Sequence, residues 1–448
     1  MVGPHSGCEV AIWMPFRQYA HSMSILSYSD KYDAYDRLLH YMTIPNVLDA
    51  IQRDLVSTPL FPSLRRLAVT ITRPKGWLDD LLPHLPSCGT QYLSIEYHAQ
   101  HSHSEGILDL MSDLSERTPS LRNLRLRIYG RYFPRNAPRI DLFANPQNQS
   151  NLQTVLLDCA FLSPLSFTRI GGFPSLRHLT IHLQETTIPD LPSSSLSFDH
   201  LVRLDIGVTQ AKLAIRFFLS MGSIPKVTRI SISISEILPF DEDLNGISHQ
   251  IRRLCLPSSF NSLEILFKKQ ASGNNPPPLM PISPGYGLHT FQPLLDFSLR
   301  NLSLSVQVPL FPPTPSLMTR MAFAWRNIVS IRLDVGCIVP FHGDLAVSIC
   351  DLIPFFRECE RLRQLYIPFQ CVESDRLPRR GVRAYALLHL GVGYVNPTSK
   401  DALVLALWLG VVAPGLPDIA LIDDDGDVVI YSISELASGA RPTSDMPS

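Results

Sequence analysis

The chain of 448 residues has few cysteines, and none of them belongs to a C-x-x-C pair. The eight cysteines are spread from Cys8 to Cys371, and their spacing fits no metal site. Scattered cysteines in a chain of this length are typical of small buried side chains in a reducing compartment. The N-terminal segment also lacks the basic start and apolar core of a signal peptide. These absences predict a cytoplasmic or nuclear protein.

An excess of one charge and long hydrophobic runs are absent as well. The formal net charge is -1, so no overall basic field favours nucleic acid and no acidic tail favours basic partners. The longest apolar run, residues 402–417, is interrupted by Pro414. Its unbroken part is too short to span roughly 30 Å of hydrocarbon. We interpret this run as a buried helix and expect no membrane partner.

The common signatures of catalysis are missing too. The chain contains no G-x-x-x-x-G-K-[ST] phosphate loop and no G-x-S-x-G nucleophile elbow. Gly391 and Gly393 lie close together but have no third glycine at the dinucleotide spacing. The sequence therefore predicts a protein that is not an enzyme, with no catalytic residue and no cofactor. An enzyme with a site near the proline-rich segment 268–316 is kept as an alternative.

Two polar clusters have the residue types of metal sites but not the spacing. "HAQHSHSE" (98–105) contains three histidines and Glu105, yet the spacing matches no zinc pattern, and a solvated loop explains it better. "LIDDDGDVVIYS" (421–432) begins like a calcium loop, but the glutamate expected at its twelfth position is out of register. An Asp-Gly hairpin turn between two short strands is the better interpretation. We predict no metal ion.

One stretch of the chain, "RNLRLRIYGRYFPRNAPR" (122–139), is rich in arginine and aromatic residues, as nucleic-acid-binding segments are. Arg125 and Arg127, however, alternate with leucines in the way expected for the exposed side of a strand. We therefore predict no nucleic-acid partner.

A repeated motif dominates what is present. The lines "LFPSLRRLAV" (60–69), "TPSLRNLRL" (118–126) and "FPSLRHLTI" (173–181) share the frame L-x-x-L-x-L. With the middle leucine as reference, weaker copies recur at a mean step of about 29 residues, at the top of the range for leucine-rich repeats. The reference positions are Leu67, Leu93, Leu124, Val155, Leu179, Leu204, Ile230, Leu266, Leu302, Ile331, Leu365, Leu390 and Ile419.

This frame has the spacing of a short, half-buried strand. Its last two leucines are two residues apart and point to one side, whereas the residues between them point to the other. One such strand cannot bury its apolar side alone, but stacked copies form a parallel sheet with a continuous core. We therefore predict an α/β fold, an irregular leucine-rich-repeat solenoid of about 12–13 units. Short parallel strands would form the concave face, and helices and loops the convex face.

The segments between the strands predict helices that end in proline. Helical apolar spacing, or apolar residues nearly throughout, occurs at 106–117, 211–222, 344–359 and 399–412. Proline then ends the helix and favours extended geometry before the next strand. We divide the chain into a helical lead-in (1–58), repeats (59–267), a Pro/Gly-rich insert (268–296), repeats with a terminal hairpin (297–432) and a flexible tail (433–448).

Three segments carry the motifs of one known family. "LFPSLRRL" is similar to a recurrent "LFPNLRSL", "WMPFRQYAHSMSIL" (13–26) to a Trp-x-x-Phe-x-x-Tyr-Ala segment, and 387–421 to a terminal strand, helix and strand. Over roughly residues 13–422 the chain thus resembles the F-box leucine-rich-repeat proteins of mushroom-forming fungi. The resemblance implies substrate recruitment to a Skp–cullin–F-box ubiquitin ligase. Only 12 residues precede Trp13, and we find no F-box in the sequence. We therefore expect a Skp-type adaptor as partner only if the protein has an F-box that is missing from this sequence.

The outward positions beside the reference leucines are the candidate contact residues. They are mixed in charge and contain Arg, Tyr and His, which are favoured at interface anchors. We expect a non-catalytic surface that binds an unknown protein substrate for an F-box-like ligase, with a ligase-independent scaffold or decoy as the alternative. The predicted partner-binding residues are Arg66, Tyr92, Glu96, Asn123, Arg125, Arg127, Asp158, His178, His182, Arg203 and Asp205.

Overall fold

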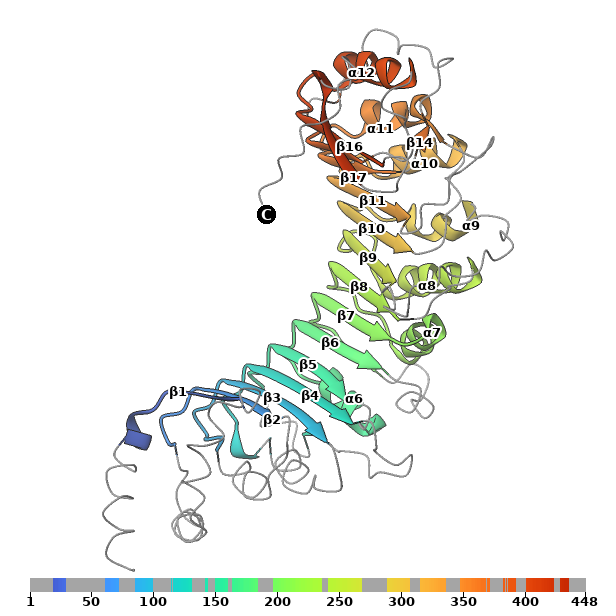
Figure 1. Cartoon of the computed structure of the whole chain (residues 1–448). Coiled ribbons are helices and arrows are strands. Elements are labelled where there is room, and N and C mark those ends of the chain that lie inside the picture. The colour runs from blue at the N-terminus through green and yellow to red at the C-terminus, as the bar shows by residue number, and fades with distance from the viewer. Residues whose placement is uncertain are drawn as a thin grey trace, which may run out of the picture. The chain divides into compact units, whose positions relative to one another are not determined.

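The protein is described here by a computed structural model (Figure 1). The chain divides into two compact units: unit 1 is Met1–Leu204 with Leu219–Ile224, and unit 2 is Asp205–Phe218 with Pro225–Ser448. The described residues are 19–29, 61–71, 85–99, 114, 116–130, 142–143, 150–159, 163–183, 196–235, 241–267, 288–306, 315–335, 347–367, 369–370, 382, 384, 386–391, 400–422 and 428–434.

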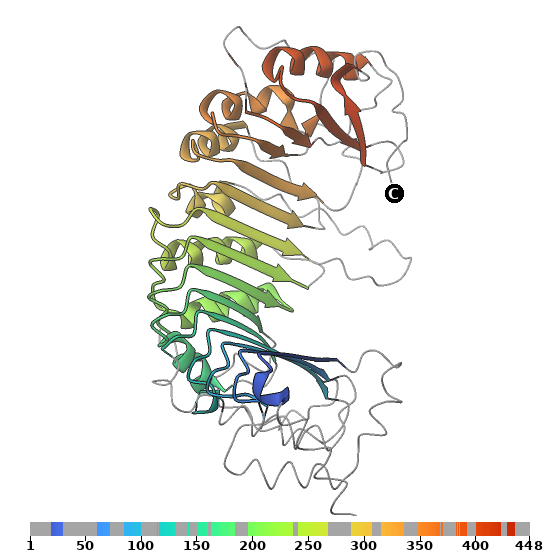
Figure 2. The same cartoon turned by 90° about the vertical axis from the view of Figure 1, so that its left-hand side faces the viewer.

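Unit 1 is built on parallel strands that pair in sequence order, and Figure 2 shows them running in one direction. Each strand is in register with the next, so that Leu67 lies beside Leu93 and Leu93 beside Leu124. The strands are β1 (Ile25–Ser29), β2 (Arg66–Ile71), β3 (Tyr92–Ala99), β4 (Asn123–Gly130), β5 (Thr154–Cys159) and β6 (His178–Leu183), and the unit boundary falls within β7 (Arg203–Val208).

Unit 2 has the same pattern of strand pairing as unit 1. Its strands pair in parallel up to β16, and β17 then returns antiparallel to β16. A separate pair is formed by β12 (Val347–Ser348) and β14 (Phe369–Gln370). The main strands are β8 (Arg229–Ile234), β9 (Ser262–Phe267), β10 (Asn301–Val306), β11 (Ser330–Val335), β13 (Gln364–Tyr366), β15 (His389–Gly391), β16 (Asp418–Ile422) and β17 (Val428–Ser432).

The alternation of the repeat determines which side chains enter the core. In β2 the residues Leu67, Val69 and Ile71 are buried, and the residues between them are exposed or half-buried. The same alternation holds in β6, β8 and β9. An α/β fold of stacked parallel strands, solenoid-like in each unit, is therefore confirmed.

One predicted reference position, Leu266, is wrong. The register pairs Leu263 of β9 with Ile230 and with Leu302, so Leu263 is the equivalent of the middle leucine. Leu266 lies on the outward side beside Glu264, because an odd shift in register turns every side chain to the other face. The number of residues from Ile230 to Leu263 consequently differs more from the number between Leu263 and Leu302 than the prediction at Leu266 implied.

The N-terminal lead-in contains a strand that the sequence analysis did not predict. A helical turn at 19–22 is followed by β1, which pairs with β2 and places Leu26 beside Leu67. The array of parallel strands therefore begins within the segment that was expected to be helical.

The Pro-Ser pairs of the repeat form β-turns immediately before the strands. The amide of Leu64 donates to the carbonyl of Phe61, and the same bond joins Leu121 to Thr118 and Leu176 to Phe173. Proline occupies the second position of each turn, where its fixed φ fits a common β-turn. Proline therefore shapes the turn itself and does more than end the preceding segment.

A backbone ladder links each turn to the next one. The carbonyl of the residue just before a strand accepts two consecutive amides from the following repeat; for example, Arg65 O accepts from Gln91 N at 2.8 Å and Tyr92 N at 3.0 Å. The same arrangement recurs at the carbonyls of Ser24, Gln91, Arg122, Gln153 and Arg177 in unit 1, and of Thr228, Asn261, Arg300, Val329 and Arg363 in unit 2.

Helices lie on one side of the strands (Figure 1). The predicted helices at 211–222 and 399–412 are confirmed as α7 (Ala211–Ser220) and α12 (Lys400–Val412). The segment 344–359 instead contains β12, a 3-10 turn (Ile349–Leu352) and a shorter helix, α11 (Ile353–Glu358). The remaining helices are α6 (Pro164–Gly171), α8 (Asp241–Leu254), α9 (Leu288–Phe291) with a 3-10 turn (Gln292–Leu294), and α10 (Pro315–Ala324).

Among the residues that the structure describes, no helix is long and apolar enough to cross a membrane. The helix α12, which contains most of the longest apolar run, buries Leu405, Trp408 and Leu409 within unit 2.

Several predicted features fall outside the described residues. They are most of the helix at 106–117, residues 268–287 of the insert, the histidines at 101 and 103, the aspartates at 423, 425 and 427, and most of the tail. The antiparallel pairing of β16 with β17 confirms the hairpin predicted around the Asp-Gly sequence.

Replacement of Gly410 by alanine is expected to stabilise unit 2 by about 0.5–1 kcal/mol. Gly410 is exposed in α12, and a Cβ atom there would meet nothing within 4 Å. Urea unfolding followed by circular dichroism measures the change. Gly171→Ala is the contrasting variant, because its Cβ would lie 2.6 Å from the carbonyl oxygen of Ser197. Gly171→Ala should therefore lower stability, whereas Gly410→Ala should raise it. Equal effects would contradict the view that the space around each glycine decides the outcome.

Candidate recognition surface

The predicted contact residues all lie on the outward face of the strands, opposite the core side chains. Arg66 and His178 are exposed, and the other nine are half-buried. Ten of the eleven residues belong to unit 1, whereas Asp205 is the first residue of unit 2. The structure therefore groups the ten residues from Arg66 to Arg203 on one unit and places Asp205 on the other.

The first group lies where the strands begin. The guanidinium carbon of Arg66 sits 4.6 Å from the centre of the Tyr92 ring, which is a cation–π contact. Tyr92 pairs in register with Asn123, and Asn123 with Thr154. Arg66, Tyr92 and Asn123 thus form one row across β2, β3 and β4.

An open pocket of ≈ 460 Å³ lies along this row. Its lining consists of residues from two successive positions of the repeat, the last residue before each strand and the first residue of the strand. We name it the strand-start pocket, and its lining residues are Ser24, Ile25, Arg65, Arg66, Gln91, Tyr92, Arg122, Asn123 and Gln153.

A second group lies four residues further along the same strands. Glu96 of β3 pairs in register with Arg127 of β4, Arg127 with Asp158 of β5, and Asp158 with His182 of β6. These four residues, named the charge row, alternate acid and base. Because neighbouring strands are only about 4.8 Å apart, each charge lies beside one of opposite or potentially opposite sign.

Each carboxylate of the charge row lies near a histidine: Glu96 near His98, and Asp158 near His182 of the row itself. His98 Nε2 lies 3.3 Å from Glu96 Oε1, and His182 Nδ1 lies 4.0 Å from Asp158 Oδ1. The side chains of Glu96 and Asp158 are 22% and 18% exposed, so both carboxylates are partly withdrawn from water. The Nε atom of Arg127 is buried and finds no acceptor among the described residues.

Tyr129 contacts both His98 and Asp158. Its ring packs against His98 with the ring centres 4.7 Å apart, and its hydroxyl donates a hydrogen bond to Asp158. Burial raises the pKa of Tyr129 above its ordinary value, and the charge of Asp158 raises it further; Arg127 opposes this, while Glu96 adds to it. The phenol is therefore held in its neutral, hydrogen-donating form.

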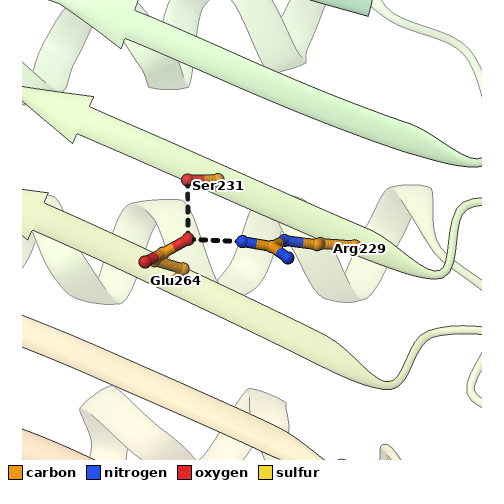
Figure 3. A network of polar contacts seen from close by, with 3 residues as sticks. All are labelled: Arg229, Ser231 and Glu264. Atoms are coloured by element: carbon orange, nitrogen blue, oxygen red, sulfur yellow. Dashed lines mark hydrogen bonds and ion pairs between the residues drawn. The ribbon is translucent and has the colours of Figure 1, made fainter. Parts of the chain in front are cut away.

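The outward face of unit 2 carries a separate polar cluster, drawn in Figure 3. Glu264 of β9 accepts from Arg229 Nη2 at 2.8 Å and from Ser231 Oγ at 3.1 Å, both on β8. Further along this unit, the guanidinium of Arg332 lies 5.6 Å from the centre of the Tyr366 ring. The ion pair between Arg229 and Glu264 joins neighbouring strands, so it stabilises the pairing of β8 with β9, although Arg229 Nε is buried without a partner among the described residues.

Sequence reasoning missed several residues of these groups. Tyr129 continues the outward alternation of residues 123, 125 and 127, so a longer strand prediction would have included it. His98 was assigned to a loop, although β3 extends to Ala99. Arg65, Arg122 and the two glutamines of the strand-start pocket precede the strands, where alternation gives no signal.

The described residues include no group of three or more His, Cys, Asp or Glu side chains that could hold a metal ion. Comparison with known proteins found no matching family model and no matching curated protein.

Proposed function

We propose that the chain is a leucine-rich-repeat protein whose unit 1 binds a protein partner through the outward face of its strands. The observation that carries this proposal is the charge row, in which Glu96, Arg127, Asp158 and His182 lie side by side on hydrogen-bonded strands. A hydrogen-bonded sheet holds such side chains at fixed spacing, which lowers the entropy cost of binding. The alternation of charge favours a partner of complementary pattern.

The ligase role is the more specific part of the proposal. The resemblance to F-box leucine-rich-repeat proteins supports a substrate receptor of a ubiquitin ligase, acting in the cytoplasm or nucleus. A scaffold or decoy would use the same surface without an adaptor. Co-purification of a Skp-type adaptor with the full chain, expressed from its transcript-verified gene, distinguishes the two roles.

Reversal of charge within the charge row is expected to abolish partner capture. Arg127→Glu would place a third acid between Glu96 and Asp158, so a partner that fits the native alternation should bind at least about 30-fold more weakly. The full chain is immobilised and incubated with a cell extract. The proteins captured by wild type and by the variant are then compared by quantitative mass spectrometry.

The matched control is Arg357→Glu. Arg357 is an exposed arginine on the helix α11, so this substitution changes the net charge equally without touching the strands. Loss of a captured protein with R127E but not with R357E supports recognition by the outward face. An unchanged set of captured proteins with R127E would contradict it.

A further inference from the structure

We propose that the strand-start pocket of unit 1 binds an acidic peptide segment of the partner through two carboxylate side chains. This inference rests on the proposed function and specifies the chemistry of what is recognised. The pocket is lined by Arg65, Arg66 and Arg122, and none of its nine lining residues is acidic. Arginine is the side chain best suited to paired hydrogen bonds with a carboxylate.

Arginine and glutamine alternate along the pocket. The residues that precede β2, β3, β4 and β5 are Arg65, Gln91, Arg122 and Gln153. The ladder of carbonyls to amides joins each of these residues to the next and fixes their order across the strands. Each cation is therefore flanked by an amide that can donate to the same bound carboxylate or accept from the peptide backbone.

The cations of the pocket have no counter-ion in the described part of the chain. No ion pair with a described carboxylate is formed by Arg65, Arg66 or Arg122. The acids of unit 1's outward face, Glu96 and Asp158, belong to the charge row, four residues beyond Tyr92 and Thr154 along their strands. That displacement is about 13 Å. The beginning of the strands is thus positive while their far ends are mixed.

The nonpolar part of the pocket favours a peptide over a bare anion. Ile25 is 62% exposed at the pocket, and the Tyr92 ring lies against the Arg66 guanidinium. A peptide can cover both surfaces with its aliphatic side chains while its carboxylates contact the arginines. A nucleic-acid strand fits less well, because the chain has a formal net charge of -1 and no overall basic field to hold phosphates beyond the pocket.

The spacing of the arginines predicts the spacing of the acids. Arg65 and Arg122 precede strands that are two steps apart, which corresponds to about 10 Å. Side chains three residues apart on a polyproline II peptide lie on one side at about 9 Å. We therefore expect acidic residues at positions i and i+3 of an extended segment that crosses the strands.

Selection from a random dodecapeptide library on the full chain tests this proposal. Wild-type protein is expected to enrich peptides with Asp or Glu three positions apart. The Arg65→Gln, Arg66→Gln, Arg122→Gln variant should lose that enrichment, and a selected peptide should bind it at least about tenfold more weakly. Replacing both acids of the peptide by amides should weaken binding to wild type by the same factor.

The matched control carries Arg300→Gln and Arg363→Gln. These arginines precede β10 and β13 in unit 2, at the same position of the repeat but outside the pocket, so acidic enrichment should persist. No acidic enrichment with wild type, or the same enrichment with the triple variant, would overturn the proposal. Arginine-dependent binding of an RNA oligonucleotide, without binding of an acidic peptide, would also overturn the proposal. Loss of partner capture in the R127E experiment tests the proposed function independently.

Discussion

Trp325→Ala is expected to lower the free energy of unfolding of unit 2 by about 3–5 kcal/mol, the usual cost of truncating a buried tryptophan. Trp325 follows α10 and is fully buried. Its Nε1 donates to the carbonyl of Leu294 at 3.2 Å, and its own carbonyl accepts from Ile328 N at 2.9 Å and is approached by Cys359 Sγ at 3.6 Å. One residue therefore joins three successive return segments. Chemical denaturation monitored by circular dichroism measures the loss.

Substitution by phenylalanine separates the packing of Trp325 from its hydrogen bond. Trp325→Phe removes the indole hydrogen bond to the carbonyl of Leu294, which keeps the amide of Phe297 as a donor at 3.1 Å. Trp408→Phe removes an indole N–H that has no partner among the described residues and was therefore buried at a cost. Both tryptophans are fully buried, so the packing loss is similar. We expect Trp325→Phe to cost about 1–2 kcal/mol more than Trp408→Phe. Equal losses would mean that the hydrogen bond to Leu294 contributes nothing.

The thiols of Cys255 and Cys359 are expected to resist alkylation in the folded protein. Burial raises the pKa of both thiols from 9.0 to about 12, and for Cys359 the charge of Glu358 adds to this effect. A rise from 9 to 12 lowers the reactive thiolate fraction at pH 8 about 1000-fold, and burial also blocks access. Among the cysteines that the structure describes, iodoacetamide at pH 8 should label the exposed Cys88 before Cys255 and Cys359, with each site measured by peptide mass spectrometry.

The same pKa shifts make stability depend on alkaline pH. A thiol that is protonated when folded but ionised when unfolded favours unfolding above pH 9, so its stabilising effect is fully present below pH 9 and is lost as pH rises towards 12. Between pH 8 and 10.5 this loss is about 2 kcal/mol for each thiol. The Cys255→Ala, Cys359→Ala variant should show a correspondingly smaller decrease in urea stability over that range. If Cys255 and Cys359 of the folded protein were labelled as fast as Cys88, both the expected resistance to alkylation and the expected loss of stability at alkaline pH would be refuted.

The strands and their buried faces follow from the sequence because a period of two residues is a local property. Leu67, Val69 and Ile71 are apolar at alternate positions, and any strand with that pattern must turn them to one side. The error at Leu266 has the same origin. In "SLEILF" apolar residues occupy both parities, so only pairing with Ile230 and Leu302 selects Leu263.

The candidate sites were predictable only in part. Glu96, Arg127, Asp158 and His182 occupy outward positions that the repeat identifies, and their alignment follows once the strands pair in register. The strand-start pocket depends on residues in turns, where side-chain direction is set by the ladder of shared carbonyls and not by alternation. The contact of Tyr129 with His98 joins two strands, so the sequence of either strand alone does not predict it.

The ladder of shared carbonyls also bears on how such a chain can change over evolutionary time. Each strand is aligned by backbone atoms of the preceding turn, and these atoms are the same whatever side chains or segment lengths lie between. The backbone register of the strands therefore does not depend on the length or the proline content of the return segment between them. Alignment and recognition thus depend on different atoms: backbone amides and carbonyls set the register, and the outward side chains can change without altering it as long as the buried side chains still pack.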